Sequence, residues 1–322
     1  MNKRTTLLLT LAVMLTIALQ RAATSPAAAQ NEGGVTSLIS RHSNGAQGNH
    51  SSSIADISAD GRWVAFQSGA DNLVDDDTNG QSDVFVHDRR TSETALISRH
   101  SDGTLADGPS NNPHLSADGR YVVFSSSATN LVDGDTQRCS TGLSDFNCSA
   151  VFIHDRTTGE TARLSVDSNG VPANGESYGS AISADGKFVA FVSEADNLVA
   201  GDTNGEADIF VHDLTTGTTS RVSVNSTAGQ ALGASSGADL SADGRLVAFD
   251  SVAANLVSGD TNGHGDVFVH DRQTGETSPV SYTHLRAHET VLDLVCRLLL
   301  EKKTQQHNTH TQVTSLIHTS HS

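Results

Sequence analysis

The chain has 322 residues, of which 20 are Lys or Arg and 37 are Asp or Glu, so its formal net charge at pH 7 is −17. A chain this acidic repels nucleic acid and anionic membranes, and its composition therefore argues against binding to either. Its length suffices for one large repeat domain.

The N-terminus has the three parts of a secretory signal peptide. Met1–Arg4 contains two basic residues, Leu7–Leu19 is apolar, and Ala27–Ala29 supplies small residues before a cleavage point. The apolar run is too short to span a bilayer, and no cysteine follows it as a lipid anchor. We therefore expect residues 1–29 to be removed on export. The mature chain should not insert into a membrane, and should reside in the periplasm or outside the cell.

Next comes the segment Thr36–Ser43, which nearly duplicates Thr94–Ser101. The later copy reads as the fourth strand of a repeat, so residues 36–41 are predicted to be an orphan closing strand. In a closed ring such a strand would pair into the last blade. The fourth repeat, however, begins its own fourth strand at Thr277. We therefore expect an incomplete ring.

Two motifs recur four times after this segment. The Ser-Ala-Asp-Gly motif has its aspartate at intervals of 58, 67 and 58 residues, at Asp60, Asp118, Asp185 and Asp243. A Phe-Val/Ile-His-Asp run follows each motif and ends at Asp88, Asp155, Asp213 and Asp271. A fixed period with one insertion indicates a single supersecondary unit that is repeated, with the insertion in a loop.

Each unit reads as four short strands. Runs of β-branched and aromatic residues are bounded by clusters of Gly, Asp and Asn, and no stretch between residues 30 and 281 has helical periodicity. The units lie near residues 54–99, 112–166, 180–224 and 238–281. Four-stranded sheets repeated in sequence predict an all-β fold, a β-propeller in which each unit is a blade.

These motifs carry a family resemblance. The Ser-Ala-Asp-Gly-Arg, Val-Phe-Val-His-Asp and Thr-Gly-Glu-Thr runs together resemble the WD-like repeats of TolB-type β-propellers of the bacterial envelope. The resemblance extends over residues 36–281 and recurs in all four units. That family is mostly non-enzymatic and binds partners, so the resemblance implies a propeller fold and a binding role without identifying the ligand.

The longer interval contains two cysteines, Cys139 and Cys148. In an exported protein, two cysteines that close a short loop predict a disulfide. The alternative is a pair of free thiols. A zinc site would need ligands that are not nearby.

The loops between the second and third strands are long and acidic. Both tight turns of a unit should fall at one end of the blade and both long connections at the other. Long loops on a rigid scaffold commonly carry binding sites. In the first unit this loop contains Asp71, Asp75, Asp76 and Asp77. We therefore expect a protein or glycan partner on the acidic long-loop face.

The same loops have the ligand spacing of a calcium site. Asp75, Asp77, Asn79 and Asp83 alternate as oxygen ligands do in a calcium loop. The later units retain three ligands each, namely Asp202, Asn204, Asp208, Asp260, Asn262 and Asp266. Val86 stands where the helix–loop–helix version has its bidentate glutamate. Two interpretations stay open, a weak Ca²⁺ site or an Asn-Gly turn without metal.

Four repeated histidines raise the question of catalysis. They are His87, His154, His212 and His270. Because the repeat places them on separate blades, they cannot share one site. We expect each to be a solvent-side strand residue beside a turn-forming aspartate. No Ser-His-Asp order, paired carboxylates or phosphate loop stands out. A non-catalytic binding or scaffold module is therefore expected. The alternative is the propeller part of a secreted hydrolase, acting on carbohydrate or peptide, whose catalytic portion is missing.

The repeat stops after Val280. Tyr282–Thr290 resembles the translated adapter used to prepare sequencing libraries, and we expect residues 282–322 to be a non-native tail. The alternative is a C-terminal helix over Val291–Leu300. The six histidines of this segment should not be read as a metal-binding tract.

Overall fold

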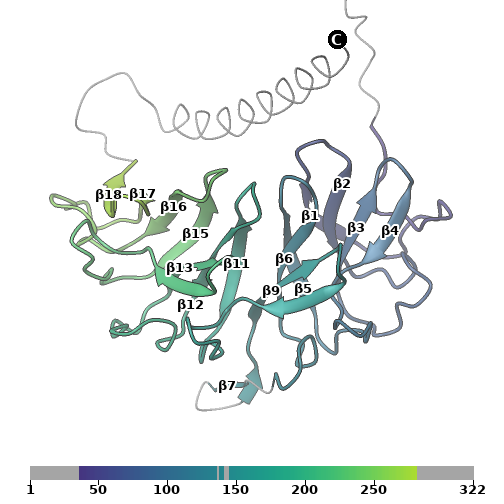
Figure 1. Ribbon diagram of the computed structural model, residues 1–322, viewed down its shortest axis with the longest axis horizontal. Coiled ribbons are helices and arrows are strands. Elements are labelled where there is room, and N and C mark those ends of the chain that lie inside the picture. Colours follow the sequence, from purple (N-terminus) through teal and green to yellow (C-terminus); the bar gives the residue numbers. More distant parts are fainter. Residues whose placement is uncertain (1–35, 136–137, 141–144, 281–322) are drawn as a thin grey trace, which may run out of the picture. The chain divides into compact units, whose positions relative to one another are not determined.

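A computed structural model describes residues 36–135, 138–140 and 145–280 (Figure 1). The predicted signal peptide, residues 1–29, and the predicted tail, residues 282–322, lie outside these ranges. All the strands belong to one compact unit that begins at Ile39. Within the described ranges, no helix is long and apolar enough to cross a membrane.

The strands form four antiparallel four-stranded sheets, one for each sequence repeat. The first blade consists of β1 (Ser52–Ile57), β2 (Trp63–Ser68), β3 (Asp83–Asp88) and β4 (Glu93–Leu96). The second consists of β5 (Ser110–Leu115), β6 (Tyr121–Ser126), β9 (Ala150–Asp155) and β10 (Glu160–Arg163). The third consists of β11 (Ser177–Ile182), β12 (Phe188–Ser193), β13 (Asp208–Asp213) and β14 (Thr218–Arg221). The fourth consists of β15 (Ser235–Leu240), β16 (Leu246–Ser251), β17 (Asp266–Asp271) and β18 (Glu276–Pro279).

The insertion of the second unit forms a small hairpin of its own. It lies between β6 and β9 and contains β7 (Arg138–Ser140) and β8 (Asp145–Asn147). The two strands pair only with each other among the described residues, and Cys139 lies opposite Phe146. The insertion therefore leaves the four-stranded sheet of the second blade intact, as a loop insertion should.

The central strands of each blade are apolar because both of their faces are covered. In the first blade β3 is buried along its whole length, and Phe85 stacks on Phe66 of β2 with ring centroids 5.8 Å apart. The same phenylalanine pair recurs in the other blades at 5.9 Å. Continuous burial is the pattern of strands packed on both faces. β17 departs from it, since Val267 and Val269 are only half-buried.

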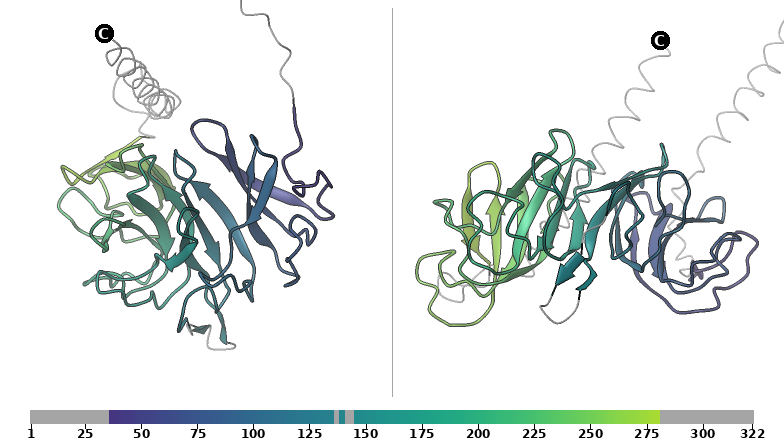
Figure 2. Two further views of the ribbon diagram at one scale, coloured as in Figure 1. Left: turned by 45° about the vertical axis from the view of Figure 1, so that its right-hand side comes forward. Right: turned by 90° about the horizontal axis from the view of Figure 1, so that it is seen from below.

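Successive blades pack against one another through their inner strands. β1 contacts β5, β5 contacts β11, and β11 contacts β15. The apolar clusters between blades join neighbours in this order, and the first and fourth blades are not joined in the same way. The all-β propeller architecture predicted from the repeat is therefore confirmed, and the four described blades do not close a ring (Figure 2).

Each blade is completed by a loop that precedes it in the chain. These capping loops comprise residues 39–49, 97–107, 164–174 and 222–232, and each contains an isolated antiparallel bridge, Arg41 with Gln47 in the first. Residues 36–41 were predicted as an orphan closing strand. Among the described residues they form no strand, and Arg41 belongs to the capping loop of the first blade.

The tight-turn ends of neighbouring blades are fastened together. The backbone N–H of Ala59 donates to the carbonyl oxygen of Ala117 in the next blade at 2.9 Å. The indole of Trp63 packs on Gly119 and lies between two guanidinium groups, those of Arg62 at 4.2 Å and Arg156 at 3.7 Å. Such cation–π contacts add to the apolar packing between blades.

Gly119 is the position at which this junction is most sensitive. Its φ of +69° disfavours other residues, and a Cβ would overlap the ring of Trp63. Gly159 is a matched control, because its φ is +79° but a Cβ there would meet nothing within 4 Å. Gly159→Ala should cost about 1–2 kcal/mol from backbone strain, and Gly119→Ala about 1–3 kcal/mol more from overpacking. Urea unfolding of both variants measures the difference, and equal losses would contradict this account of the junction.

Candidate functional site

The tight-turn ends of the first, second and fourth blades are held by structural ion pairs. Arg62 makes a two-pronged contact with Asp88, with 2.7 Å between Nη2 and Oδ2. The guanidinium holds the pKa of Asp88 well below its usual range. Equivalent pairs join Arg120 with Asp155 and Arg245 with Asp271, both at 2.6 Å. These carboxylates are engaged in the fold, so they are not free to bind a ligand.

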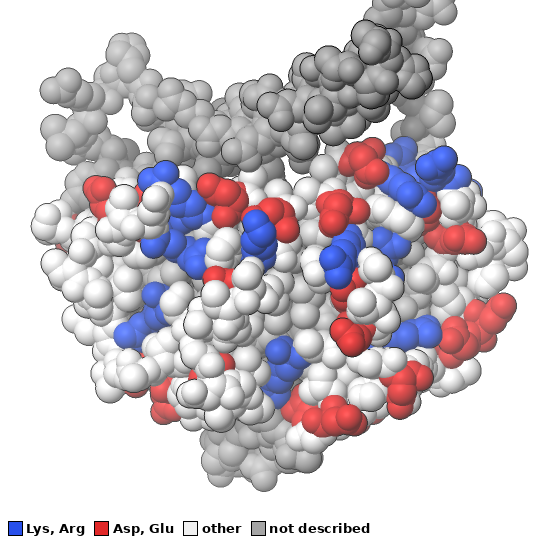
Figure 3. Space-filling view, in the orientation of Figure 1, with Lys and Arg blue, Asp and Glu red and all other residues white. Residues whose placement is uncertain are grey.

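The long-loop end carries acidic side chains that project fully into solvent. The side chain of Asp75 is 99% exposed and that of Asp133 is 104% exposed. Each lies beside a histidine of its capping loop, with Nε2 of His42 3.3 Å from Asp75 and Nε2 of His100 3.6 Å from Asp133. In the view of Figure 3, basic and acidic side chains are interleaved rather than separated into patches.

One asparagine locks each long loop to its capping loop. In the first blade Nδ2 of Asn72 donates to the carbonyl oxygen of Gln47, and its Oδ1 accepts from the N–H of Asn49, both at 2.9 Å. The same two bonds are made by Asn130, Asn197 and Asn255. Loops held by two bonds in every unit are preorganised, which lowers the entropy lost on binding.

The predicted calcium ligands of the first unit do not all come together. Asp77 and Asp83 are buried, at 6% and 0% exposure, whereas Asp75 projects into solvent. Asn79 donates from Nδ2 to Asp83 at 2.8 Å, and its Oδ1 accepts from the N–H of Gln81. Its amide oxygen is thus used by the turn. Among the described residues, no group of three or more His, Cys, Asp or Glu side chains could hold a metal ion.

In the third unit an arginine lies at the corresponding carboxylates. Nη1 of Arg221 is 2.9 Å from Asp202 and 3.2 Å from Asp208, and all three side chains are buried. Asn204 donates to Asp208 at 2.9 Å, as its counterpart does in the first unit. A metal ion here would have to displace a guanidinium that already pairs with both carboxylates.

The second and fourth units differ again. In the second, Asp135 pairs with Arg163 at 2.7 Å, and Ala150 replaces the other carboxylate. In the fourth, Asn262 donates to Asp266 at 2.7 Å, and the Oδ1 atom of Asp260 is buried without a hydrogen-bond partner. Sequence reasoning missed the two arginines, although alignment of the four repeats places both at the end of the fourth strand.

The environment of Asp77 is unfavourable to its charge. Burial raises its pKa to about 6, with a further contribution from the nearby charge of Asp83. Burial also raises the pKa of Asp83, against hydrogen bonds from Ser98 and Asn79. The Oδ1 atom of Asp77 is buried and accepts no hydrogen bond. Asp77 and Asp83 therefore lack a paired guanidinium such as Arg221 provides for Asp202 and Asp208 in the third unit.

The four repeated histidines are buried, and the prediction that they face solvent was wrong. Nδ1 of His154 lies 2.9 Å from the hydroxyl of Thr161, which donates to the carbonyl oxygen of Arg99 at 2.6 Å. Because the hydroxyl hydrogen points at that carbonyl, the histidine must be the donor from Nδ1. The same chain joins His87, His212 and His270 to their capping loops. Each histidine therefore holds its blade to a capping loop. The prediction failed because this loop covers the strand face that was expected to meet solvent.

The inner strands present a second candidate site. Each contains a bulge, at which the first two blades place non-glycine residues, Ile54 with φ 47° and Asn112 with φ 51°. Asp56, His114 and Ser180 are among the residues that line a cavity of about 490 Å³ between these strands. Positive φ at non-glycine residues is a sign of strain that often accompanies binding sites. The motif search did not detect this site.

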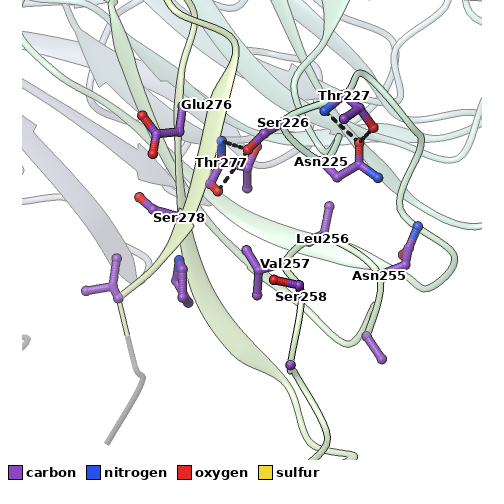
Figure 4. Close-up of a pocket in the computed structure, with 14 residues that line it drawn as sticks. Asn225, Ser226, Thr227, Asn255, Leu256, Val257, Ser258, Glu276, Thr277 and Ser278 are labelled. Atoms are coloured by element: carbon purple, nitrogen blue, oxygen red, sulfur yellow. Dashed lines mark hydrogen bonds between the residues drawn. The ribbon is translucent and has the colours of Figure 1, made fainter. Parts of the chain in front are cut away.

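Two other hollows differ in their chemistry. One of about 960 Å³ lies beside β18, where the N–H of Thr277 donates to the hydroxyl of Ser226 and the hydroxyl of Thr227 donates to Asn225 (Figure 4). The other, of about 380 Å³, lies on the long-loop face of the second blade and is lined by His100 and Asp133 among others. The second is the one that lies on the long-loop face and contains a histidine and a carboxylate.

Cys148 is disulfide-bonded. The side chain of Cys139 lies outside the described residues, so its pairing with Cys148 stays a prediction. Peptide mapping of exported protein should find these two cysteines linked. Cys139→Ser should lower stability by about 1–3 kcal/mol, because the loop that the disulfide closes is short. Free thiols at both positions in exported material would refute the pairing.

The histidine chain predicts acid sensitivity. Burial lowers the pKa of His154 to about 4 from 6.5. The unfolded chain therefore binds more protons between these values, and stability present above pH 6.5 is lost as the pH falls to about 4. The loss should be on the order of 2–3 kcal/mol for this residue. Unfolding across this window should depend less on pH in His154→Gln than in the unmodified chain. Identical pH profiles would contradict a neutral, buried His154.

No family model matches the chain, and no curated protein does. Similar solved structures include one assigned as TolB from Agrobacterium tumefaciens, with a TM-score of 0.46 and 16% identity over 74% of this chain and 64% of that one. TolB from Acinetobacter baumannii matches with a TM-score of 0.43 and 19% identity over 73% and 45%. The β-propeller domain of the Trilobed protease from Pyrococcus furiosus gives 0.42 and 11% over 72% and 57%. The chain spans less than two thirds of each. The structures that resemble it are thus TolB and related β-propeller proteins.

Proposed function

We propose that the protein is an exported, non-catalytic binding or scaffold module that engages a protein or glycan partner through its long-loop face. The observation that carries this proposal is the asparagine lock, which fixes the long loop of every described blade. A rigid scaffold with polar groups on fixed loops is the usual arrangement of a binding surface.

The chemistry of the loops suggests what the partner carries. Exposed carboxylates of Asp75 and Asp133 accept hydrogen bonds, and each has a histidine of the capping loop beside it. The hollow at His100 adds the side chains of Thr129 and Asn130. Such groups suit the basic side chains of a protein or the hydroxyl groups of a glycan.

Two features support export. Residues 1–29 have the sequence of a signal peptide. The disulfide of Cys148 is of a kind that persists in oxidising compartments. Both fit a protein of the periplasm or the extracellular space.

A matched pair of variants tests the binding face. Asp75→Asn with Asp133→Asn removes two charges from the long-loop end. Glu93→Gln with Glu160→Gln removes two exposed charges from the tight-turn end. Bacterial envelope extracts and a glycan array should show a ligand whose affinity falls about tenfold or more, or about 1.4 kcal/mol, in the first variant only.

Equal binding by both variants would refute the assignment of the face. The full chain should also be assayed with peptide and glycoside substrates. Turnover would overturn the non-catalytic proposal and favour the alternative, a hydrolase of carbohydrate or peptide of which these blades are one part.

A further inference from the structure

One position distinguishes the four units at their buried carboxylates. It is the last residue of the outermost strand, occupied by Leu96, Arg163, Arg221 and Pro279 in chain order. The second and third units thus carry a guanidinium at this point, and the first and fourth do not. The carboxylates themselves are retained as a pair in the first, third and fourth units.

In the third unit the arginine pairs with both carboxylates. Its Nη1 atom lies 2.9 Å from Asp202 and 3.2 Å from Asp208, and the exposed fraction of its side chain is only 9%. Two buried carboxylates repel each other and lose hydration, so a cation between them offsets a large cost. The repeat therefore has a defined place for one positive charge.

The first unit has the carboxylates without the arginine. Asp77 and Asp83 are 6% and 0% exposed, and the Oδ1 atom of Asp77 is buried with no hydrogen-bond partner. The side chain of Leu96 is buried and uncharged. The positive charge of Arg99 favours the ionised form of Asp83 from a distance, but the guanidinium itself contacts Asp76 at 3.4 Å.

We propose that Asp77 and Asp83 together bind one calcium ion, which supplies the positive charge that Arg221 supplies in the third unit. Carboxylate oxygens are the preferred ligands of this hard cation, and water completes its coordination. The Oδ1 atom of Asp77 is buried and has no hydrogen-bond partner, so it is free to bind an ion. Magnesium suits the pair less well, since it demands octahedral geometry and gives up its waters reluctantly.

With two protein carboxylates the site is weak, with a dissociation constant on the order of 0.1–1 mM. Calcium at about 10 mM should therefore raise the melting temperature of the full chain by about 3 °C or more. Magnesium at equal ionic strength is the control for screening of the acidic surface. This response does not require a partner, so it is independent of the proposed function.

Reciprocal exchange of the two residues gives the sharpest test. Leu96→Arg places the built-in cation in the first unit, and should raise the melting temperature in chelator while removing the calcium response. Arg221→Leu removes it from the third unit, and should lower the melting temperature in chelator while adding a calcium response. Asp77→Asn should abolish the response without requiring a large side chain to fit.

The unmodified chain should respond to calcium more than to magnesium. Equal melting temperatures in calcium, magnesium and chelator would overturn the proposal. They would show that Arg99 or a bound proton is enough to offset the charge of Asp77 and Asp83. A full calcium response in Leu96→Arg or in Asp77→Asn would also overturn it, because the ion would then bind elsewhere. Isothermal titration of calcium into the same variants gives the stoichiometry, expected to fall by one site per chain in Leu96→Arg.

Discussion

The structure depends on a hydrogen-bond chain that ties the outer strand of each blade to the loop before that blade. A buried histidine donates to a threonine hydroxyl, which donates to a backbone carbonyl of the capping loop. The outer strand has only four residues in each blade, too few to be held securely by its ladder alone. Because these hydrogen bonds join each capping loop to the blade that follows it, the structural repeat is a capping loop followed by four strands.

The two ends of each blade are held by different interactions. At the tight-turn end, arginine–aspartate pairs hold the first, second and fourth blades internally, and aromatic–glycine contacts join neighbouring blades. At the long-loop end, the asparagine locks hold loops whose carboxylates remain exposed. The ion pairs and the proposed binding surface thus lie at opposite ends of each blade. The buried carboxylate pairs also lie at the long-loop end, and an arginine pairs with them in the third unit but not in the first.

Much of this architecture follows from the sequence, because the period and the turn residues recur. The four units, their strand number and the two kinds of end could all be predicted. The first strand of each unit was harder to place, since a bulge breaks the alternation at Gly237 and its equivalents. Burial of His154 could not be anticipated from period-2 alternation, because a distant loop covers that face. The role of Arg221 is invisible in its own motif and appears only when the units are aligned. Asp75 belongs to the predicted ligand spacing, yet the turn directs it into solvent.

Hydrogen exchange of the threonine amides tests most directly whether each blade is closed by its capping loop. In every blade this amide donates to a serine hydroxyl of the capping loop, as Thr161 does to Ser101 at 2.9 Å. The account predicts that the amides of Thr94, Thr161, Thr219 and Thr277 exchange as slowly as those of the central strands. Exchange as fast as that of an exposed loop, in the intact chain at neutral pH, would contradict it.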